Sequence, residues 1–273
     1  MIQHRNRESI ILSLDLASDD PEARAAVVVP VPAPPRVAAV EGGDPLVYLE
    51  QATATPRAQS SGDGETTGAG VDVLGRERVG GYDVARLGSA DGRALERWLA
   101  KHGYALPAGA APILSEYADE NWRFVAIRLA PGSDGVLKPL KISFDSEETV
   151  YPMRLEQLAT EPLSLTLFVL ARAERRVKGL DRTWSGGIDE LQPRPPAELE
   201  ALFDSDQHLT RIEADGVDPS RFTRDLVIEA LPSPPGAAGP DEPGLSTLGF
   251  VLIAVGGLLV LVVAFVVKAR RDG

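Results

Sequence analysis

The feature that most constrains this chain is an apolar segment near its C-terminus. Residues 244–267 carry no charged side chain, and residues 248–267 (LGFVLIAVGGLLVLVVAFVV) are almost wholly apolar. A helix rises about 1.5 Å per residue, so this segment would cover about 30 Å, the thickness of the hydrocarbon core of a bilayer. Helices of soluble proteins rarely run so far without a polar face. We therefore predict a transmembrane helix at 248–267, with the lipid bilayer as a partner.

The charges on either side of this segment predict its orientation. Three basic residues follow it within 268–273, whereas Asp241 and Glu242 precede it. Basic flanks stay on the cytoplasmic side of a membrane. We therefore expect residues 268–273 to be a cytoplasmic tail and everything before the span to lie outside a cell membrane that the chain crosses once.

Export of the body requires an N-terminal signal, and the first residues do not supply one. Residues 1–8 (MIQHRNRE) lead directly into an alternating apolar run, with no apolar h-region and no cleavage site. Two explanations remain open at this point. Either the true start lies upstream with a signal peptide, or the protein is tail-anchored with its body in the cytoplasm. We favour the first, because the second would carry the basic tail across the bilayer.

The rest of the chain divides into a body and a short stalk. Residues 1–232 have the composition of a folded domain, whereas residues 233–247 (SPPGAAGPDEPGLST) are too rich in Pro and Gly to form a packed element. Without residues 268–273, 25 basic and 39 acidic side chains remain, a net charge of −14. Such an anionic body is repelled by nucleic acid and by anionic headgroups, so no nucleic-acid partner is expected. The absence of cysteine excludes disulfides, thiolate nucleophiles and Cys-rich zinc sites.

Apolar patterning predicts an α+β body with a mixed or largely antiparallel sheet and a few helices. The predicted strands are residues 10–16, 25–31, 82–87, 122–130, 140–144, 163–172 and 226–231. In 122–130, Trp122, Phe124 and Ala126 are expected to form one core-facing side. The polar, Gly-rich stretch 59–70 is expected to be a surface loop.

Three helices are predicted among these strands. The first begins at a Ser89 or Asp91 cap, carries Leu95, Trp98, Leu99 and His102 at helical spacing, and ends at Gly103. The others span residues 111–119 and 196–203. His102 would lie in the last turn of the first helix, where an imidazole favours the terminal carbonyls, so we interpret it as structural.

Motifs that carry chemistry are largely missing. His4, His102 and His208 do not have zinc-ligand spacing, and no phosphate-binding glycine loop opens a helix after a strand. The serine in Gly88–Gly92 is off-centre for a nucleophile elbow and fits a turn better. A Ser–His–Asp triad assembled only by the fold stays open. We therefore predict no catalytic, cofactor-binding or metal-ligating residue.

Acidic and basic clusters have ordinary explanations. Pairs such as Glu147–Glu148 and Asp215 with Asp218 are expected by chance in so acidic a body. The stretch 204–208 begins like a calcium loop but lacks the required Gly and Glu further along. The basic run at Arg175–Arg176 is expected to be a solvated strand end or hairpin shoulder.

Several segments, in this order and spacing, resemble the bacterial DUF2330 family. They are 27–32 (VVVPVP), 98–107 (WLAKHGYALP), Tyr117 with 122–126 (WRFVA), 137–140 (LKPL) with 142–144 (ISF), 151–155 (YPMRL), 209–211 (LTR) and 225–227 (DLV). The resemblance implies an exported bacterial protein with no established catalytic residues. Its members often begin with a signal peptide and a Cys-containing segment, and this chain has neither, which favours a start downstream of the true one or a diverged member.

These observations leave three functional hypotheses. The leading one is a single-pass membrane protein whose extracytoplasmic body is a binding or envelope-structure module. The alternative is an extracytoplasmic hydrolase of cell-wall, polysaccharide or peptide substrates, which a Ser–His contact or a cleft with converging carboxylates would favour. The third is an accessory subunit that pairs through its span, although Gly249 and Gly256 lack the four-residue spacing of a dimer motif.

Overall fold

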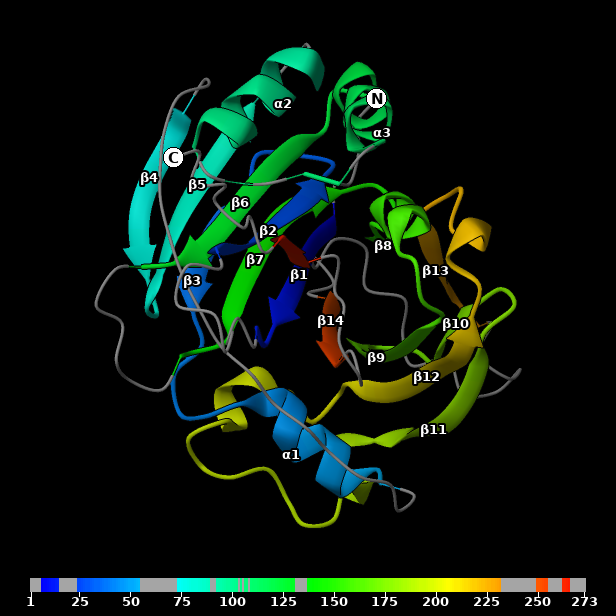
Figure 1. Ribbon diagram of the computed structural model, residues 1–273. Helices are drawn as coiled ribbons and strands as arrows, with labels where there is room; N and C mark the ends of the chain where they lie inside the picture. The colour runs from blue at the N-terminus through cyan, green and yellow to red at the C-terminus, as the bar shows by residue number, and fades with distance from the viewer. Residues whose placement is uncertain are drawn as a thin grey trace, which may run out of the picture.

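Two β-sheets lie face to face, with helices on their outer faces (Figure 1). The structure, a computed structural model, describes residues 6–14, 24–54, 73–88, 92–102, 104, 106–107, 109–130, 137–231, 249–254 and 262–265. The predicted α+β class with antiparallel sheets is confirmed over these residues.

The larger sheet has seven strands in the order β11-β12-β9-β14-β1-β7-β3. Its pairs are antiparallel except that β14 runs parallel to β1. The strands are β1 (Asn6–Leu12), β3 (Arg36–Ala39), β7 (Leu140–Ser146), β9 (Leu163–Ala171), β11 (Asp181–Gly187), β12 (His208–Val217) and β14 (Gly249–Ala254).

The second sheet has five antiparallel strands in the order β15-β2-β6-β5-β4, and a small third sheet has the order β10-β13-β8. The five are β2 (Arg24–Val31), β4 (Val73–Val79), β5 (Tyr82–Gly88), β6 (Arg123–Leu129) and β15 (Val262–Phe265). The small sheet contains β8 (Val150–Tyr151), β10 (Arg175–Val177) and β13 (Leu226–Ala230).

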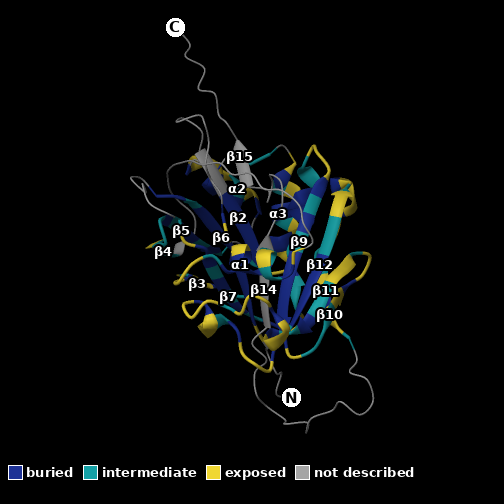
Figure 2. Cartoon of the chain, turned by 90° about the horizontal axis from the view of Figure 1, so that it is seen from below, coloured by how far each residue is buried: buried dark blue, intermediate teal, exposed yellow. Residues whose placement is uncertain are grey.

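Each outer face is covered by helices. Helices α2 (Gly92–Lys101) and α3 (Ala110–Asp119) lie on the five-stranded sheet, and α1 (Pro45–Ala52) lies on the seven-stranded sheet (Figure 1). Four short 3₁₀ turns, η1 (Arg154–Leu158), η2 (Ile188–Glu190), η3 (Glu200–Leu202) and η4 (Pro219–Arg221), complete the described elements. Buried residues fill the interior between these layers, while exposed residues follow the connecting segments (Figure 2).

The alternation of side chains along the strands explains this layering. On β1, Ile10 and Leu12 enter the core between the sheets, whereas Ile11 packs on the other side with α1. On β6, Phe124 and Ala126 face a core as expected, and this core is formed with α2 and α3; Val125 and Ile127 are equally buried, between the two sheets. The expected half-buried strand is therefore covered on both sides, because the seven-stranded sheet packs on one face of β6 and the helices pack on the other.

Most predicted elements form within a few residues of the expected bounds. The helix predicted at 196–203 is wrong: this stretch forms turns and η3, held by bonds such as Leu199 N–H to Pro196 C=O (2.8 Å) and Phe203 N–H to Glu200 C=O (3.0 Å). Its apolar residues still pack under α1, because side chains three residues apart lie on the same side of a 3₁₀ turn, much as they do on an α-helix. Ser89, Asp91, Gly103 and the loop 59–70 lie outside the described residues.

The C-terminal segment differs from its prediction where it is described. Residues 249–254 and 262–265 are strands, β14 and β15, and not parts of a helix. Val, Ile and Phe are strong strand formers, and β14 satisfies the backbone groups of β1 and β9 on its two sides. The rest of 248–267, the stalk at 233–247 and the tail at 268–273 lie outside the described residues. None of the helices within the described ranges has the length and apolar character to cross a bilayer.

Candidate functional site

A cavity of about 290 Å³ opens between α2 and the sheet formed by β4, β5 and β6. We call it the α2 cavity. Its lining combines three aromatic rings with three guanidinium groups and two carboxylates. The lining residues are Arg76, Glu77, Arg78, Asp83, Val84, Ala85, Trp98, His102, Tyr104 and Arg128.

An aromatic stack forms one wall of the α2 cavity. Trp98 on α2 and His102, the first residue after α2, are four residues apart, so their rings lie one above the other, with centroids 4.1 Å apart and an interplanar angle of 12°. Tyr104, just beyond the helix, stacks on the same indole at 5.7 Å. The guanidinium of Arg76 lies 5.6 Å from the indole centroid. The sequence placed Trp98 and His102 on one helix face but did not indicate what would cover them.

His102 has a defined tautomer. Its Nδ1 lies 2.7 Å from the carbonyl oxygen of Trp98, and a carbonyl can only accept, so Nδ1 carries the proton. Burial, together with the charges of Arg76, Lys101 and Arg128, lowers the pKa of His102 to about 4. The ring is therefore neutral at pH 7, and Nε2 is an acceptor. The bond to Trp98 confirms the predicted helix-end role, while Nε2 remains available to the cavity.

Arg128 supplies the principal charge at the floor of the α2 cavity. Its Nη2 donates to Asp83 (2.8 Å), and its guanidinium lies 6.0 Å from the ring of Tyr104. Glu77, the second lining carboxylate, lies 3.3 Å from Arg86. Both acids are thus paired with arginine. Burial, with a contribution from Asp83, raises the pKa of Tyr104 to about 12, so this phenol stays protonated.

Several polar atoms of this lining are buried without a partner. Among the described residues, Trp98 Nε1, His102 Nε2, and Arg128 Nε and Nη1 have no hydrogen-bond partner. Trp98 and His102 are only 2% and 1% exposed. Buried polar groups are normally satisfied, and leaving one unpaired costs about 1–3 kcal/mol. These three donor atoms and one acceptor atom belong to residues that line the cavity, so they are the groups that an occupant would satisfy.

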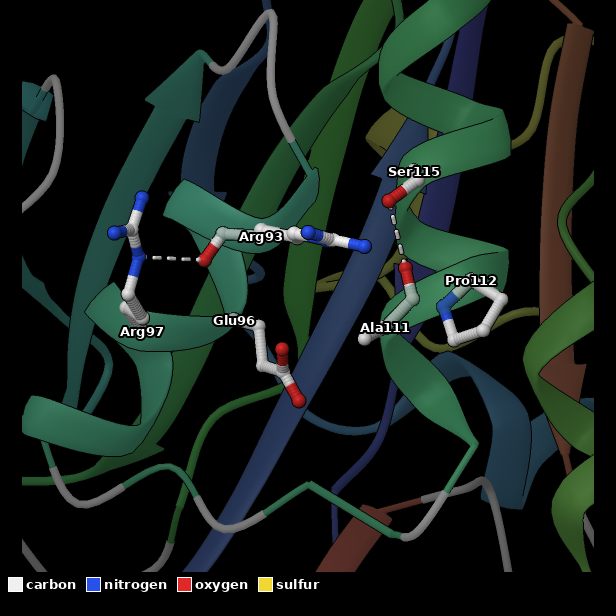
Figure 3. A pocket seen from close by; sticks show the side chains of 6 residues that line it. All are labelled: Arg93, Glu96, Arg97, Ala111, Pro112 and Ser115. Carbon is white, nitrogen blue, oxygen red and sulfur yellow. Dashed lines mark hydrogen bonds between the residues drawn. The ribbon is translucent and has the colours of Figure 1, made fainter.

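A larger cavity, of about 700 Å³, lies between α2 and α3 and is shown in Figure 3. Two of its polar groups are engaged within their own helices: Ser115 donates to the Ala111 carbonyl (2.9 Å), and Arg97 Nε donates to the Arg93 carbonyl (3.1 Å). Hydrogen bonds within each helix therefore account for these groups. This larger cavity is therefore a weaker candidate for a binding site than the α2 cavity.

A Ser–His contact lies on the seven-stranded sheet. Ser185 on β11 and His208 on β12 are 2.8 Å apart, from Oγ to Nε2. Burial is the main reason that the pKa of His208 is lowered, with Glu190 opposing it. The carboxylate of Glu190 accepts from the backbone N–H of Gly187 (2.7 Å). The fold thus brings together a serine and a histidine that no sequence motif connected.

The remaining sequence candidates have structural partners. Asp206, in the calcium-like stretch, lies 3.3 Å from Arg172, and Asp204 packs in a turn with Gln207. Arg176 on β10 pairs with Glu229 at a solvated strand end, as expected. In the described ranges, no three His, Asp or Glu side chains converge in a way that could hold a metal ion. His4 lies outside these ranges.

All three of the cavity's arginines, Arg76, Arg78 and Arg128, were missed from the sequence. Arg76 and Arg128 lie on β4 and β6 and look like ordinary solvent-facing residues of alternating strands. The only available signal was the RxR pattern at Arg76 and Arg78, which is common on exposed strands. Their convergence on α2 depends on strand register, in which Asp83 lies opposite Arg128.

Two facing, mainly antiparallel sheets with helical outer layers define an α+β protein with a polar cavity on its helical side. The chain belongs to the family described as "Uncharacterized protein conserved in bacteria (DUF2330)", which it matches over residues 2–229. The resemblance seen in the sequence is thereby confirmed. No curated protein and no solved structure matches the chain. Strands β14 and β15 lie beyond the family-matched residues.

Proposed function

We propose that this protein is a single-pass, membrane-anchored binding module of the bacterial envelope. Its body lies outside the cell membrane, and its α2 cavity binds a small anion that also carries a hydroxyl group. The observation that supports the ligand class is the set of unpartnered, buried polar atoms on Trp98, His102 and Arg128.

The donor and acceptor character of these atoms supports this class of ligand. Arg128 and Trp98 offer N–H donors, which an oxyanion satisfies best, and guanidinium matches the planar fork of a carboxylate. His102 Nε2 offers a lone pair and needs a donor, which a hydroxyl supplies. A hydroxycarboxylic acid or an acidic sugar has both groups. A simple inorganic anion without a proton would leave His102 unsatisfied.

Charge favours the same class of ligand. The lining carries Arg76, Arg78 and Arg128 against Glu77 and Asp83, so it is net cationic. The whole chain, by contrast, has a net charge of −12. A local positive site in an anionic body attracts small anions and repels large polyanions, because screening limits the site's influence to about 10 Å while the body acts at longer range.

Anchoring rests on the sequence of residues 248–267 and on the basic residues that follow. Twenty residues without a charge are long enough to span a bilayer, and the cationic tail favours a cytoplasmic C-terminus. The Pro- and Gly-rich residues 233–247 would hold the anionic body away from anionic headgroups.

The ligand assignment is tested by calorimetric titration of the full chain in detergent with glucuronate, which bears a carboxylate and hydroxyls. Glucose, which lacks the carboxylate, is the comparison. Glucuronate should bind, and Arg128→Gln should weaken it at least tenfold, about 1.4 kcal/mol. Trp98→Phe, which keeps the ring but removes Nε1–H, should weaken binding by a smaller factor.

Arg123→Gln is the matched control for Arg128→Gln. Arg123 lies on the same strand but bonds to Asn121 at the surface, away from the cavity lining. Arg123→Gln should leave the affinity for glucuronate unchanged. Equal binding of glucose and glucuronate, or equal losses in both arginine variants, would contradict the assignment.

A second candidate function, an extracytoplasmic hydrolase, is favoured by the contact between Ser185 and His208. The histidine nitrogen that faces Ser185 is Nε2, as a general base requires. A fluorophosphonate probe distinguishes the candidates: covalent labelling that is lost in both Ser185→Ala and His208→Gln would support the hydrolase. Unlabelled protein that still binds glucuronate would support the binding module.

A further inference from the structure

Strand β14 occupies an interior position of the seven-stranded sheet although it comes from the end of the chain. Its residues 249–253 are in register with Glu8–Leu12 of β1, and 250–254 are in register with Thr166–Leu170 of β9. On one side of β14 lie β1, β7 and β3, and on the other lie β9, β12 and β11. One strand from outside the family-matched residues therefore joins the two halves of the sheet.

The position that β14 fills is apolar and one strand wide. Ile10 and Ile11 on β1, and Leu167 and Phe168 on β9, are all 0% exposed. Strands in a sheet are about 4.8 Å apart, so β1 and β9 are separated by about twice that spacing and cannot pair directly. If β14 left, the inward-facing N–H and C=O groups of both neighbours would lose their partners. The position can therefore be filled by an extended apolar segment whose backbone N–H groups are free to pair with both neighbouring strands.

The same residues lie in the first part of the apolar segment 248–267, which carries no charged side chain. As a helix this stretch would span a bilayer, and as a strand its first part completes the sheet. A residue cannot be in both conformations at once. Between β13 and β14 lie residues 231–248, which could reach about 3.3 Å per residue if extended, so chain length permits either placement.

We propose that the interval between β1 and β9 is a strand-acceptor site for residues 249–254, and that its occupation and membrane insertion of 248–267 exclude each other. The body thus shields the first part of its own anchor before insertion. Insertion withdraws β14 and leaves an acceptor that fits an extended apolar strand. This proposal rests on the membrane anchoring proposed above and is independent of the α2 cavity.

A disulfide tests the exchange cleanly, because the chain has no cysteine of its own. Val169 and Val251 are directly opposite each other on β9 and β14. Directly opposite residues on antiparallel strands approach closely enough for a disulfide. Val169→Cys with Val251→Cys should therefore cross-link under mild oxidation before any vesicle is added. The control pair, Val169→Cys with Val263→Cys, should not, because Val263 pairs with Ala26 in the other sheet.

Flotation with phosphatidylcholine vesicles then measures insertion. The oxidised 169–251 protein should remain unbound, and the same protein reduced with dithiothreitol should float at least tenfold more. A second cysteine pair, Leu12→Cys with Ile253→Cys, cross-links β14 to β1 instead. Its oxidised form should also fail to float, which would show that the effect comes from holding β14 in the sheet and not from the substitutions at 169 and 251. Circular dichroism checks that each variant is folded.

The outcomes separate the two proposals. Equal flotation of oxidised and reduced protein, or no cross-link in either cysteine pair, would overturn the proposed exchange of β14 between sheet and membrane while leaving membrane anchoring in place. If reduced and unmodified proteins both fail to float, the anchoring itself is wrong, and the exchange fails with it.

Discussion

Arg154 connects more of the structure than any other single side chain described above. It donates to both oxygens of Glu120 at the end of α3 (2.6 Å each) and to Asp225 (3.0 Å). Its guanidinium also lies 3.8 Å from the ring centroid of Tyr117. The side chain is 9% exposed. A buried charge with this many partners ties α3, η1 and the start of β13 together.

We expect Arg154→Met to destabilise the fold by about 3–5 kcal/mol, because it leaves Asp225 buried without a cation. Arg176→Met is the matched control, since Arg176 forms a comparable ion pair with Glu229 (2.8 Å) but is 59% exposed. The control should cost less than about 1 kcal/mol. Urea denaturation of both variants measures the difference, and similar losses would show that burial of the pair is unimportant.

Glu8 makes stability depend on pH. Burial raises the pKa of Glu8 from 4.5 to about 8, against the opposing effect of the Val150 N–H, which donates to Oε2 (3.2 Å). Below pH 4.5 the carboxyl is protonated in both states. Between the two pKa values only the folded state holds the proton, so stability falls as pH rises and levels off above about 8.

Glu8→Gln should therefore leave stability unchanged at pH 4 and increase it at pH 8, by an amount on the order of 4 kcal/mol. Asp145→Asn on the neighbouring strand is the control, because Asp145 is 46% exposed beside Arg7. It should show little difference between the two pH values. Urea midpoints at both pH values provide the measurement, and a Glu8→Gln effect that is equal at pH 4 and 8 would refute the assignment.

At the scale of elements, the close approach of α2 and α3 depends on Gly92. A Cβ added there would meet the Cα and N of Ser115 as well as its hydroxyl. Backbone atoms of α3 cannot rotate away as a side chain can. The contact therefore fixes how α2 sits over the sheet, and with it the wall of the α2 cavity.

Gly92→Ala should cost about 1–3 kcal/mol, since it forces the two helices apart. Adding Ser115→Ala removes the hydroxyl but leaves the Cα and N of residue 115 in place. The double variant should therefore not regain the stability that Gly92→Ala loses. Thermal unfolding of the two single variants and the double variant measures this. Full recovery would mean that only the hydroxyl was in the way.

At the scale of the whole molecule, the proposed orientation makes the body accessible from outside the cell. Protease added to intact cells should degrade the body and spare an epitope placed after residue 273. Permeabilised cells, in which the epitope is also cut, are the control. A protected body with an exposed epitope would instead support the tail-anchored alternative.

Much of the fold was predictable from local patterns. Alternating and continuous apolar runs predicted β2, β5, β6, β7, β9 and β13, because side-chain period reports burial directly. Helix α1 was missed: it is only eight residues long, and Asp44 caps it through a single bond to Leu46 N–H (2.8 Å). So short a helix is held by packing on β9 and not by its own propensity.

The sequence alone determined the family, the α+β class, the acidic body and the position of the one segment that is apolar throughout. The family follows from the order and spacing of several sequence motifs, and the other three follow from composition or short-range periodicity. Only the tertiary structure decided that Arg128 lines the same cavity as Trp98 and His102, that Ser185 contacts His208, and that residues 249–254 complete a sheet. These contacts join residues distant in the chain through strand register and layer packing, which no local pattern encodes.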